Sequence, residues 1–290
     1  MLKHKIINWS IFIFLSVIWG TSFILMKIAN EELTGIEIGS IRIFAAGLVF
    51  LPFSIFHLPK IPRGKLLLVI VSGFLGSFFP AYLFAIAIEN KIDSSLAGIL
   101  NSLTPLLVIV IGIIFFKSSI RRKKITGVIV GFIGLVILSL SEGGISLQNY
   151  AFASLILLGT LMYAFNINIV SKYLKEVEPM HIATVSLSFM TVFAGILLWY
   201  HGVGIKLQQN NNVLIPVIIA ALLGIIASAL ATALFYVLIK RAGGLFASLV
   251  TYAIPVVAIF WGVSAGEQVT IIQIACLFMI LGGVYLANKN

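Results

Sequence analysis

Two stretches that lie 150 residues apart decide the fold: AGILNSLTPLLVIVIGIIFFK (97–117) and ASLVTYAIPVVAIFWGVSAGE (247–267). Each is an apolar run with a proline in its interior, Pro105 in the first and Pro255 in the second. A helix needs about 20 mostly apolar residues to cross a bilayer, and each run has that length. The match indicates that the second half of the chain repeats the first.

The repeat extends in both directions from these stretches. Upstream, FLGSFFPAYLFAIAI (74–88) resembles LLGIIASALATALFYVLI (222–239). Downstream, GFIGLVIL (131–138) resembles LGGVYL (281–286). Each half holds five apolar runs, and because five is odd, the second copy must lie upside down relative to the first. Inverted repeats are typical of transporters that work by alternating access.

The composition is that of a chain embedded in a membrane. Of the 290 residues, 61% are hydrophobic and 10% are charged, whereas soluble domains carry about 25% charged residues. No run alternates apolar and polar residues, so helices rather than strands are expected to span the bilayer. We predict an all-α integral membrane fold of ten transmembrane helices as two inverted five-helix repeats, residues 1–145 and 146–290. The candidate spans are 9–27, 38–57, 66–88, 94–116, 125–141, 151–171, 181–200, 213–239, 244–265 and 268–287.

Positive charge predicts which way the chain crosses the membrane. With the N-terminus inside the cell, fifteen of the nineteen lysines and arginines fall on the inner side, and seven of the nine acids fall on the outer side. Lysine and arginine in short loops stay cytoplasmic. Both termini are therefore expected in the cytoplasm of a bacterium, with the chain in its inner membrane. The basic cluster at 117–124 is chiefly a topology signal that can also contact lipid phosphates, and no nucleic-acid partner is expected.

Several stretches resemble the drug/metabolite transporter superfamily, in its EamA family. They are WGTSFILMKIA (19–29), IRIFAAGLVFLP (41–52), LNSLTPLLVIVIGIIFF (100–116) and the whole segment 236–289. The resemblance covers essentially the entire chain. It implies an inner-membrane carrier with a central cavity between its halves, and substrates in the family include amino acids, nucleobases, sugars and drugs.

The chain departs from the family's pattern at one place. Phe116 and Lys117 stand where the second copy has Gly266 and Glu267. Glu267 is therefore expected to have a structural or gating role on the outer side rather than to bind a proton.

Eight polar or aromatic side chains near the middle of paired spans are predicted to bind substrate. Asn101 and Thr251 each lie one helical turn before a proline, on the same face. For all eight the alternative is helix packing, because aromatic residues in membrane helices more often pack and Asn or Thr also bond neighbouring helices. The set is Trp19, Phe23, Tyr82, Asn101, Tyr163, Asn166, Tyr236 and Thr251.

Other residues are expected to have structural roles. Arg42 lies about 6 Å inside its span at 1.5 Å per residue, and we expect it to reach outward or to pair with Glu31 or Glu37 as an anchor. Gly127 and Gly131 form a small-xxx-small pair, which indicates close helix packing.

The predicted function is secondary transport of a small metabolite or a drug across the cytoplasmic membrane, with export as the expected direction. A membrane enzyme is the main alternative, and a scaffold or receptor is the next. An enzyme would need clustered acids or histidines, but the one aspartate, Asp93, and the four histidines lie at span ends. We expect no enzyme activity, catalytic residue, metal site or cofactor. The expected partners are a small-molecule substrate and membrane lipid. The sequence leaves open whether transport is coupled to a proton or a counter-substrate, and whether the protein is a monomer or a homodimer.

Overall fold

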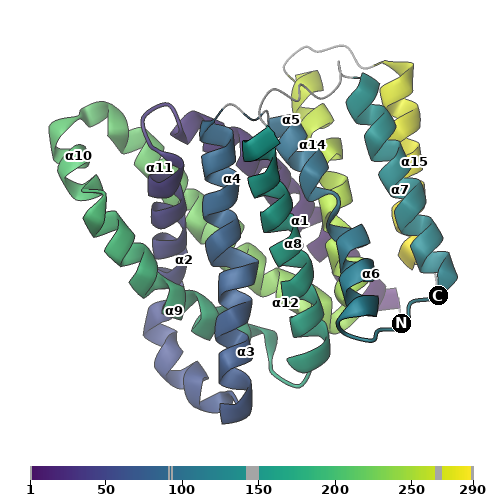
Figure 1. The fold of residues 1–290 in the computed structure, drawn as a ribbon, viewed down its shortest axis with the longest axis horizontal. Coiled ribbons are helices and arrows are strands. Elements are labelled where there is room, and N and C mark those ends of the chain that lie inside the picture. The colour runs from purple at the N-terminus through teal and green to yellow at the C-terminus, as the bar shows by residue number, and fades with distance from the viewer. Residues whose placement is uncertain (1, 91, 93, 142–149, 265–269, 289–290) are drawn as a thin grey trace.

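The computed structural model describes residues 2–90, 92, 94–141, 150–264 and 270–288, and all regular structure in these ranges is helical (Figure 1). Glu267, Asp93 and Glu142 lie outside the described residues. In chain order the helices are α1 (Leu2–Ala29), α2 (Gly35–His57), η1 (Leu58–Lys60), α3 (Arg63–Gly73), η2 (Phe74–Phe78), α4 (Phe79–Glu89), α5 (Ser94–Asn101), α6 (Thr104–Ile114), α7 (Arg122–Ser141), α8 (Tyr150–Tyr173), α9 (Pro179–Tyr200), α10 (Val203–Gln209), η3 (Asn211–Val213), α11 (Leu214–Leu222), η4 (Leu223–Leu230), α12 (Ala231–Ala242), α13 (Gly244–Ser248), α14 (Val250–Ser264) and α15 (Ile271–Asn288).

Helical runs in the described part of the chain are long and apolar enough to cross a membrane in six cases. These runs are His4–Ala29, Gly35–Lys60, Arg63–Glu89, Ala151–Tyr173, Pro179–Tyr200 and Asn211–Ala242. Three shorter apolar helices accompany them, at Thr104–Ile114, Gly244–Val257 and Ile274–Ala287. The predicted all-helical, multi-pass membrane fold is confirmed, while the count of ten spans stays a prediction.

Helix packing follows a two-fold pattern. The helix α1 packs on α14 and α12, and its counterpart α8 packs on α6 and α4. Similarly, α2 packs on α11 and η4, whereas its counterpart α9 packs on α3 and η2. Two counterpart pairs, α2 with α9 and α7 with α15, pack directly on each other, and Figure 1 shows them toward opposite edges of the molecule. Exchanging the halves therefore leaves these contacts between counterpart helices unchanged.

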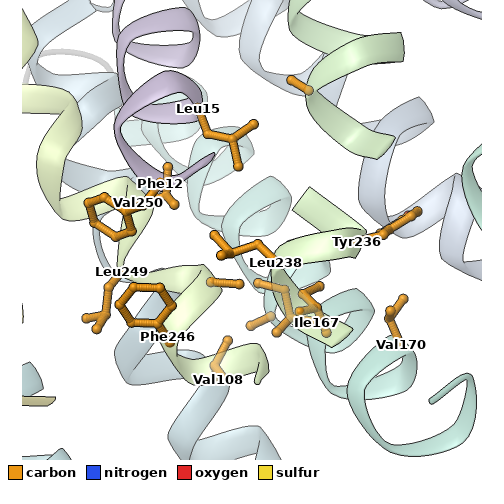
Figure 2. Close-up of a cluster of buried hydrophobic side chains, with 14 of the residues drawn as sticks. Phe12, Leu15, Val108, Ile167, Val170, Tyr236, Leu238, Phe246, Leu249 and Val250 are labelled. Carbon is orange, nitrogen blue, oxygen red and sulfur yellow. The ribbon is translucent and has the colours of Figure 1, made fainter. Parts of the chain in front are cut away.

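The largest apolar cluster joins the two halves (Figure 2). Leu15 of α1 and Val108 of α6 come from the first half, while Ile167 of α8, Leu238 of α12 and Val250 of α14 come from the second. All five side chains are buried. Because this cluster needs elements from both halves, neither half can bury its own share of the cluster alone.

Glycines bring α7 and α15 into backbone contact. A Cβ added to Gly283 would lie 2.5 Å from the Gly131 nitrogen and 2.7 Å from the Gly127 carbonyl oxygen. The prediction that Gly127 and Gly131 serve close packing is confirmed, and their partner is a third glycine on the counterpart helix. Small residues let membrane helices approach closely enough for dispersion contacts to hold them together.

Gly283→Ala should therefore lower the melting temperature in detergent, because the added methyl meets backbone atoms that cannot rotate away. Overpacking of this kind costs roughly 1–3 kcal/mol. Gly282→Ala is the matched control, since nothing lies within 4 Å of a Cβ at that position. Equal melting temperatures for the two variants would contradict the proposed tight contact.

Candidate functional site

The helix is interrupted between α5 and α6, beside the predicted site residue Asn101. Pro105 lacks the N–H that would bond the carbonyl of Asn101. The Thr104 hydroxyl donates to that carbonyl at 2.5 Å. The sequence predicted one continuous span, 94–116, but the helix is interrupted and Pro105 stands in the first turn of α6. The missing N–H costs least in a first turn, because such groups have no partner within the helix.

The matching proline in the second half lies inside α14 and leaves the carbonyl of Thr251 without its helical donor. The hydroxyl of Ser102, from the break between α5 and α6, lies 3.0 Å from that carbonyl and shares its proton between it and the Gly98 carbonyl at 2.8 Å. One half thus satisfies a backbone group that the other half has freed. A separate break, at Leu249, divides α13 from α14.

Two π-helical segments, η2 and η4, lie at corresponding places in the two halves and face the same interior space. Insertions of this type open the backbone ladder and are frequent at functional sites. They contribute Gly76 and Ser77 from η2 and Ala227 and Ser228 from η4. The indole nitrogen of Trp19 donates to the Ala227 carbonyl at 3.0 Å, so the wider backbone turn is held by an aromatic side chain from α1.

A cavity lies where these breaks and π-helices meet. It holds about 840 Å³ of unfilled space, counted with its open part. Seven of the eight predicted site residues line it: Trp19, Phe23, Asn101, Tyr163, Asn166, Tyr236 and Thr251. Tyr82 does not. Its hydroxyl bonds to Ser40 at 3.1 Å and its ring packs on Phe78, so it belongs to the contact between α2 and α4.

Aromatic rings form two related walls of the cavity. Trp19 meets Phe235 edge to face with centroids 5.2 Å apart, and Tyr163 meets Phe84 at 6.0 Å. The first pair joins α1 to α12 and the second joins α8 to α4. These are corresponding helix pairs in the two halves. Phe23 adds a further ring against Phe84 at 6.0 Å. The cavity therefore offers flat apolar surfaces from both halves.

Polar atoms in the cavity are incompletely bonded. The Tyr236 hydroxyl bonds Ser72 at 3.2 Å and accepts a long bond from the Asn166 amide nitrogen at 3.5 Å. The amide oxygen of Asn166 and the hydroxyl of Ser77 have no partner, although the two residues are only 2% and 7% exposed. Folded proteins pair nearly all buried polar atoms, so unpaired ones facing a cavity point to a ligand or to bound water.

Arg42 also lines the cavity, which the sequence analysis did not predict. It is buried; its Nε donates to the Ser228 hydroxyl at 2.7 Å, and its Nη1 faces the Met26 sulfur at 3.7 Å. Within the described ranges, no carboxylate oxygen lies within 4.0 Å of its guanidinium group. The interpretation of Arg42 as an anchor paired with Glu31 or Glu37 is therefore wrong.

The local structure at the start of α2 explains why Glu37 is not its partner. Thr34 caps α2 and accepts a bond from the Glu37 N–H, while the Glu37 carboxylate accepts one from the Thr34 N–H at 2.7 Å. The same carboxylate pairs with Lys206 of α10 at 3.1 Å. A capping box turns this acid toward the helix end, away from the cavity.

A glycine positions Arg42. A Cβ on Gly224 would collide with the Arg42 carbonyl oxygen, so only glycine lets η4 approach α2 this closely. Ser228, one turn later, then reaches the guanidinium group. The sequence held a usable signal: the positions three and four residues from Arg42, including Ile38 and Ala46, carry no acid that could pair with it along the helix.

Two of the four histidines meet at the contact between α2 and α9. The Nδ1 atoms of His57 and His181 lie 2.8 Å apart and the rings meet edge to face. Among the residues that the structure describes, no group of three or more His, Cys, Asp or Glu side chains gathers to hold a metal. The pair links two helices at their ends, away from the cavity lining.

A multi-pass helical membrane protein with a cavity between two related halves is the class that this fold and site define. The model of the EamA-like transporter family matches residues 7–140 and again residues 151–289. The chain belongs to the EamA-like transporter family, as the resemblance implied. A solved crystal structure superposes with a TM-score of 0.68 over 98% of this chain and 97% of the other at 16% identity, a likeness of fold.

Curated relatives of the chain are named as transporters. An uncharacterized transporter of Archaeoglobus fulgidus is 24% identical over 98% of this chain and 99% of its own length. The uncharacterized inner membrane transporter YedA of Escherichia coli is 26% identical over 94% of this chain and 88% of its own length. A protein of Chlamydia muridarum named S-adenosylmethionine/S-adenosylhomocysteine transporter is 24% identical over 91% and 86%.

Ser102→Ala should destabilise the protein, because the Thr251 carbonyl freed by Pro255 would lose its donor from across the site. Leaving a buried polar group unpaired costs about 1–3 kcal/mol, which a thermal unfolding series in detergent can detect. Ser154→Ala is the control, since that hydroxyl donates only to an exposed carbonyl of its own helix. An equal effect of the two substitutions would refute the role of Ser102 in bridging the halves.

Proposed function

We propose that this protein is a secondary transporter that carries a small metabolite across the bacterial cytoplasmic membrane by alternating access, with export as its direction. The observation that carries the proposal is the cavity between two halves whose packing pattern is two-fold. A transporter must hold its cargo where gates on both sides can reach it, and a site near a two-fold axis meets that need. The family and the named relatives support transport rather than an enzymatic reaction.

The helix breaks support a cavity that can change shape. Interruptions at Ser102–Leu103 and Leu249, together with η2 and η4, surround the site from both halves. Discontinuous helices near the midplane are typical of substrate sites in transporters with inverted repeats. We propose residues 1–145 and 146–290 as the two halves that move against each other, with ten spans in all.

Substrate binding is assigned to seven residues of the cavity, Trp19, Phe23, Asn101, Tyr163, Asn166, Tyr236 and Thr251. Ligand pockets are mostly apolar with a few placed polar groups, and this set has both kinds. The rings form the walls, while the amides and hydroxyls orient the cargo. The relative in Chlamydia muridarum makes S-adenosylmethionine and S-adenosylhomocysteine the first compounds to assay.

The orientation with both termini in the cytoplasm is supported by contacts at one end of the bundle. Figure 1 shows both chain ends on the same side as the connection from α6 to α7, where Arg121 to Lys124 lie. At the end of α12, Arg241 donates to the Asn8 amide oxygen at 2.8 Å. Basic residues thus gather on the side that holds the termini, as cytoplasmic loops do.

Tyr163→Phe should weaken substrate binding about two- to tenfold, because one neutral hydrogen bond contributes about 0.5–1.5 kcal/mol. Asn101→Ala should have a similar effect, and uptake into proteoliposomes is the measurement. Tyr82→Phe is the matched control, since that hydroxyl lies outside the cavity. The binding-site proposal fails if the control variant loses as much affinity as Tyr163→Phe, or if neither cavity variant loses any.

Fusions of alkaline phosphatase test the orientation, because the enzyme is active only outside the cytoplasm. We expect an inactive fusion after Lys124 and an active one after Glu142. Cytoplasmic β-galactosidase fused at the same two points should give the reverse pattern. Activity of the phosphatase after Lys124 alone would overturn the proposed orientation.

A further inference from the structure

We infer that the cargo of the central cavity carries a carboxylate group and that Arg42 binds it; this inference rests on the proposed transport function. The guanidinium group uses Nε for Ser228 and turns Nη1 toward the Met26 sulfur. A thioether sulfur is a weak acceptor, so most N–H donors of the Arg42 guanidinium group stay available for a ligand. A charge inside a membrane protein is costly unless paired. Since no carboxylate of the described chain pairs with Arg42, the anion is expected from the cargo.

The lining of the cavity gives no alternative site for a charged group. Among the described residues that line it, Arg42 is the one ionised side chain, and the others are apolar, aromatic, hydroxyl-bearing or amide-bearing. A single positive charge in such surroundings attracts anions and repels cations. A cargo whose only charge is an ammonium group would leave two like charges in one cavity.

One positive charge matches a carboxylate better than a phosphate monoester. A phosphate monoester carries about −1.5 to −2 at neutral pH, so a single arginine would leave part of that charge uncompensated. The planar guanidinium fork also matches the two oxygens of a carboxylate. We therefore assign the anion to a carboxylate.

The unpaired acceptor of Asn166 indicates a second feature of the cargo. Its amide oxygen is buried and without a partner, and its amide nitrogen already faces Tyr236. An acceptor in that position is satisfied by an N–H or O–H group on the ligand. The Ser77 hydroxyl, also unpaired, lies on the same cavity and can donate or accept. An organic acid that also bears an amino or hydroxyl group, attached to an apolar body, satisfies all of these groups.

The experiment compares three probes with the same indole body: indole-3-propionate with a carboxylate only, tryptamine with an ammonium only, and L-tryptophan with both. Each is titrated against the full-length protein in lipid nanodiscs, and the rise in melting temperature gives a Kd. We expect both carboxylates to bind and tryptamine to bind at least tenfold more weakly. Binding of tryptamine alone, or of none of the three, would contradict the inference. Tighter binding of phenyl phosphate than of 3-phenylpropionate would overturn the assignment to a carboxylate.

Variants then assign the contacts. Arg42→Gln should weaken indole-3-propionate by about 10- to 100-fold, as expected for a charge-assisted hydrogen bond, and should leave tryptamine unchanged or tighter. Lys27→Gln removes an exposed charge from α1 and should change none of the three. Asn166→Leu should weaken L-tryptophan but not indole-3-propionate, which lacks the amino group. A Gln variant that binds all three probes as the wild type does would refute the role of Arg42.

Arg42→Lys distinguishes a loss of binding from a loss of folding, because it keeps the positive charge and removes the planar guanidinium group. We expect carboxylate affinities between those of the wild type and the Gln variant, with the melting temperature of the free protein as the control for folding. Equal loss for carboxylates and tryptamine in this variant would indicate a merely structural role. If the probes bind through Arg42 but are not transported in proteoliposomes, the transport proposal alone is rejected. If the protein transports only amines, the assignment of a carboxylate cargo alone is rejected.

Discussion

Inside a bilayer no water reaches the backbone, so each carbonyl that a proline or a wide helical turn releases must find a donor within the protein. This constraint decides where the helices of this protein can break. Asn101 and Thr251 lose their helical donors and recover them from Thr104 and Ser102, and Ala227 is bonded by Trp19. Five of these six residues line the cavity, and Ser102 lies directly beside it in the chain, so irregular backbone and the cavity occur in the same place.

The same constraint applies to charge. Glu37 is accommodated in the first turn of α2 because a capping box and Lys206 satisfy its carboxylate. Arg42, about one and a half turns further along α2, has only a hydroxyl and a sulfur as partners among the described residues. A cation left in this state within the membrane is best explained by a ligand that supplies its counter-charge. The packing glycine at position 224 then has a functional consequence, because it sets the distance between α2 and η4 that orients the arginine.

Repetition in the sequence predicted much of the fold and seven of the residues that line the cavity. Matched prolines and similar apolar stretches identified which helices correspond, and polar or aromatic residues near the middle of paired spans identified seven residues of the cavity. Tyr82 was included because its depth fits, but helix rotation, which depends on neighbouring helices, turns it toward Ser40. Arg42 was assigned to the outer side because distance along the sequence suggested Glu37, whereas capping geometry had already engaged that acid. Rotation and capping depend on three-dimensional contacts that linear spacing does not contain.

The central claim is that one cavity between the halves opens alternately to the two sides of the membrane. Ser77 is suited to test it, since its hydroxyl faces the cavity without a partner and cysteine has nearly its size. In a Cys276→Ala background, which removes the one native thiol, Ser77→Cys can be treated with a membrane-impermeant thiol reagent from either side of oriented vesicles. The account predicts labelling from both sides, each slowed by bound cargo. Labelling from one side only, whatever cargo is present, would contradict alternating access.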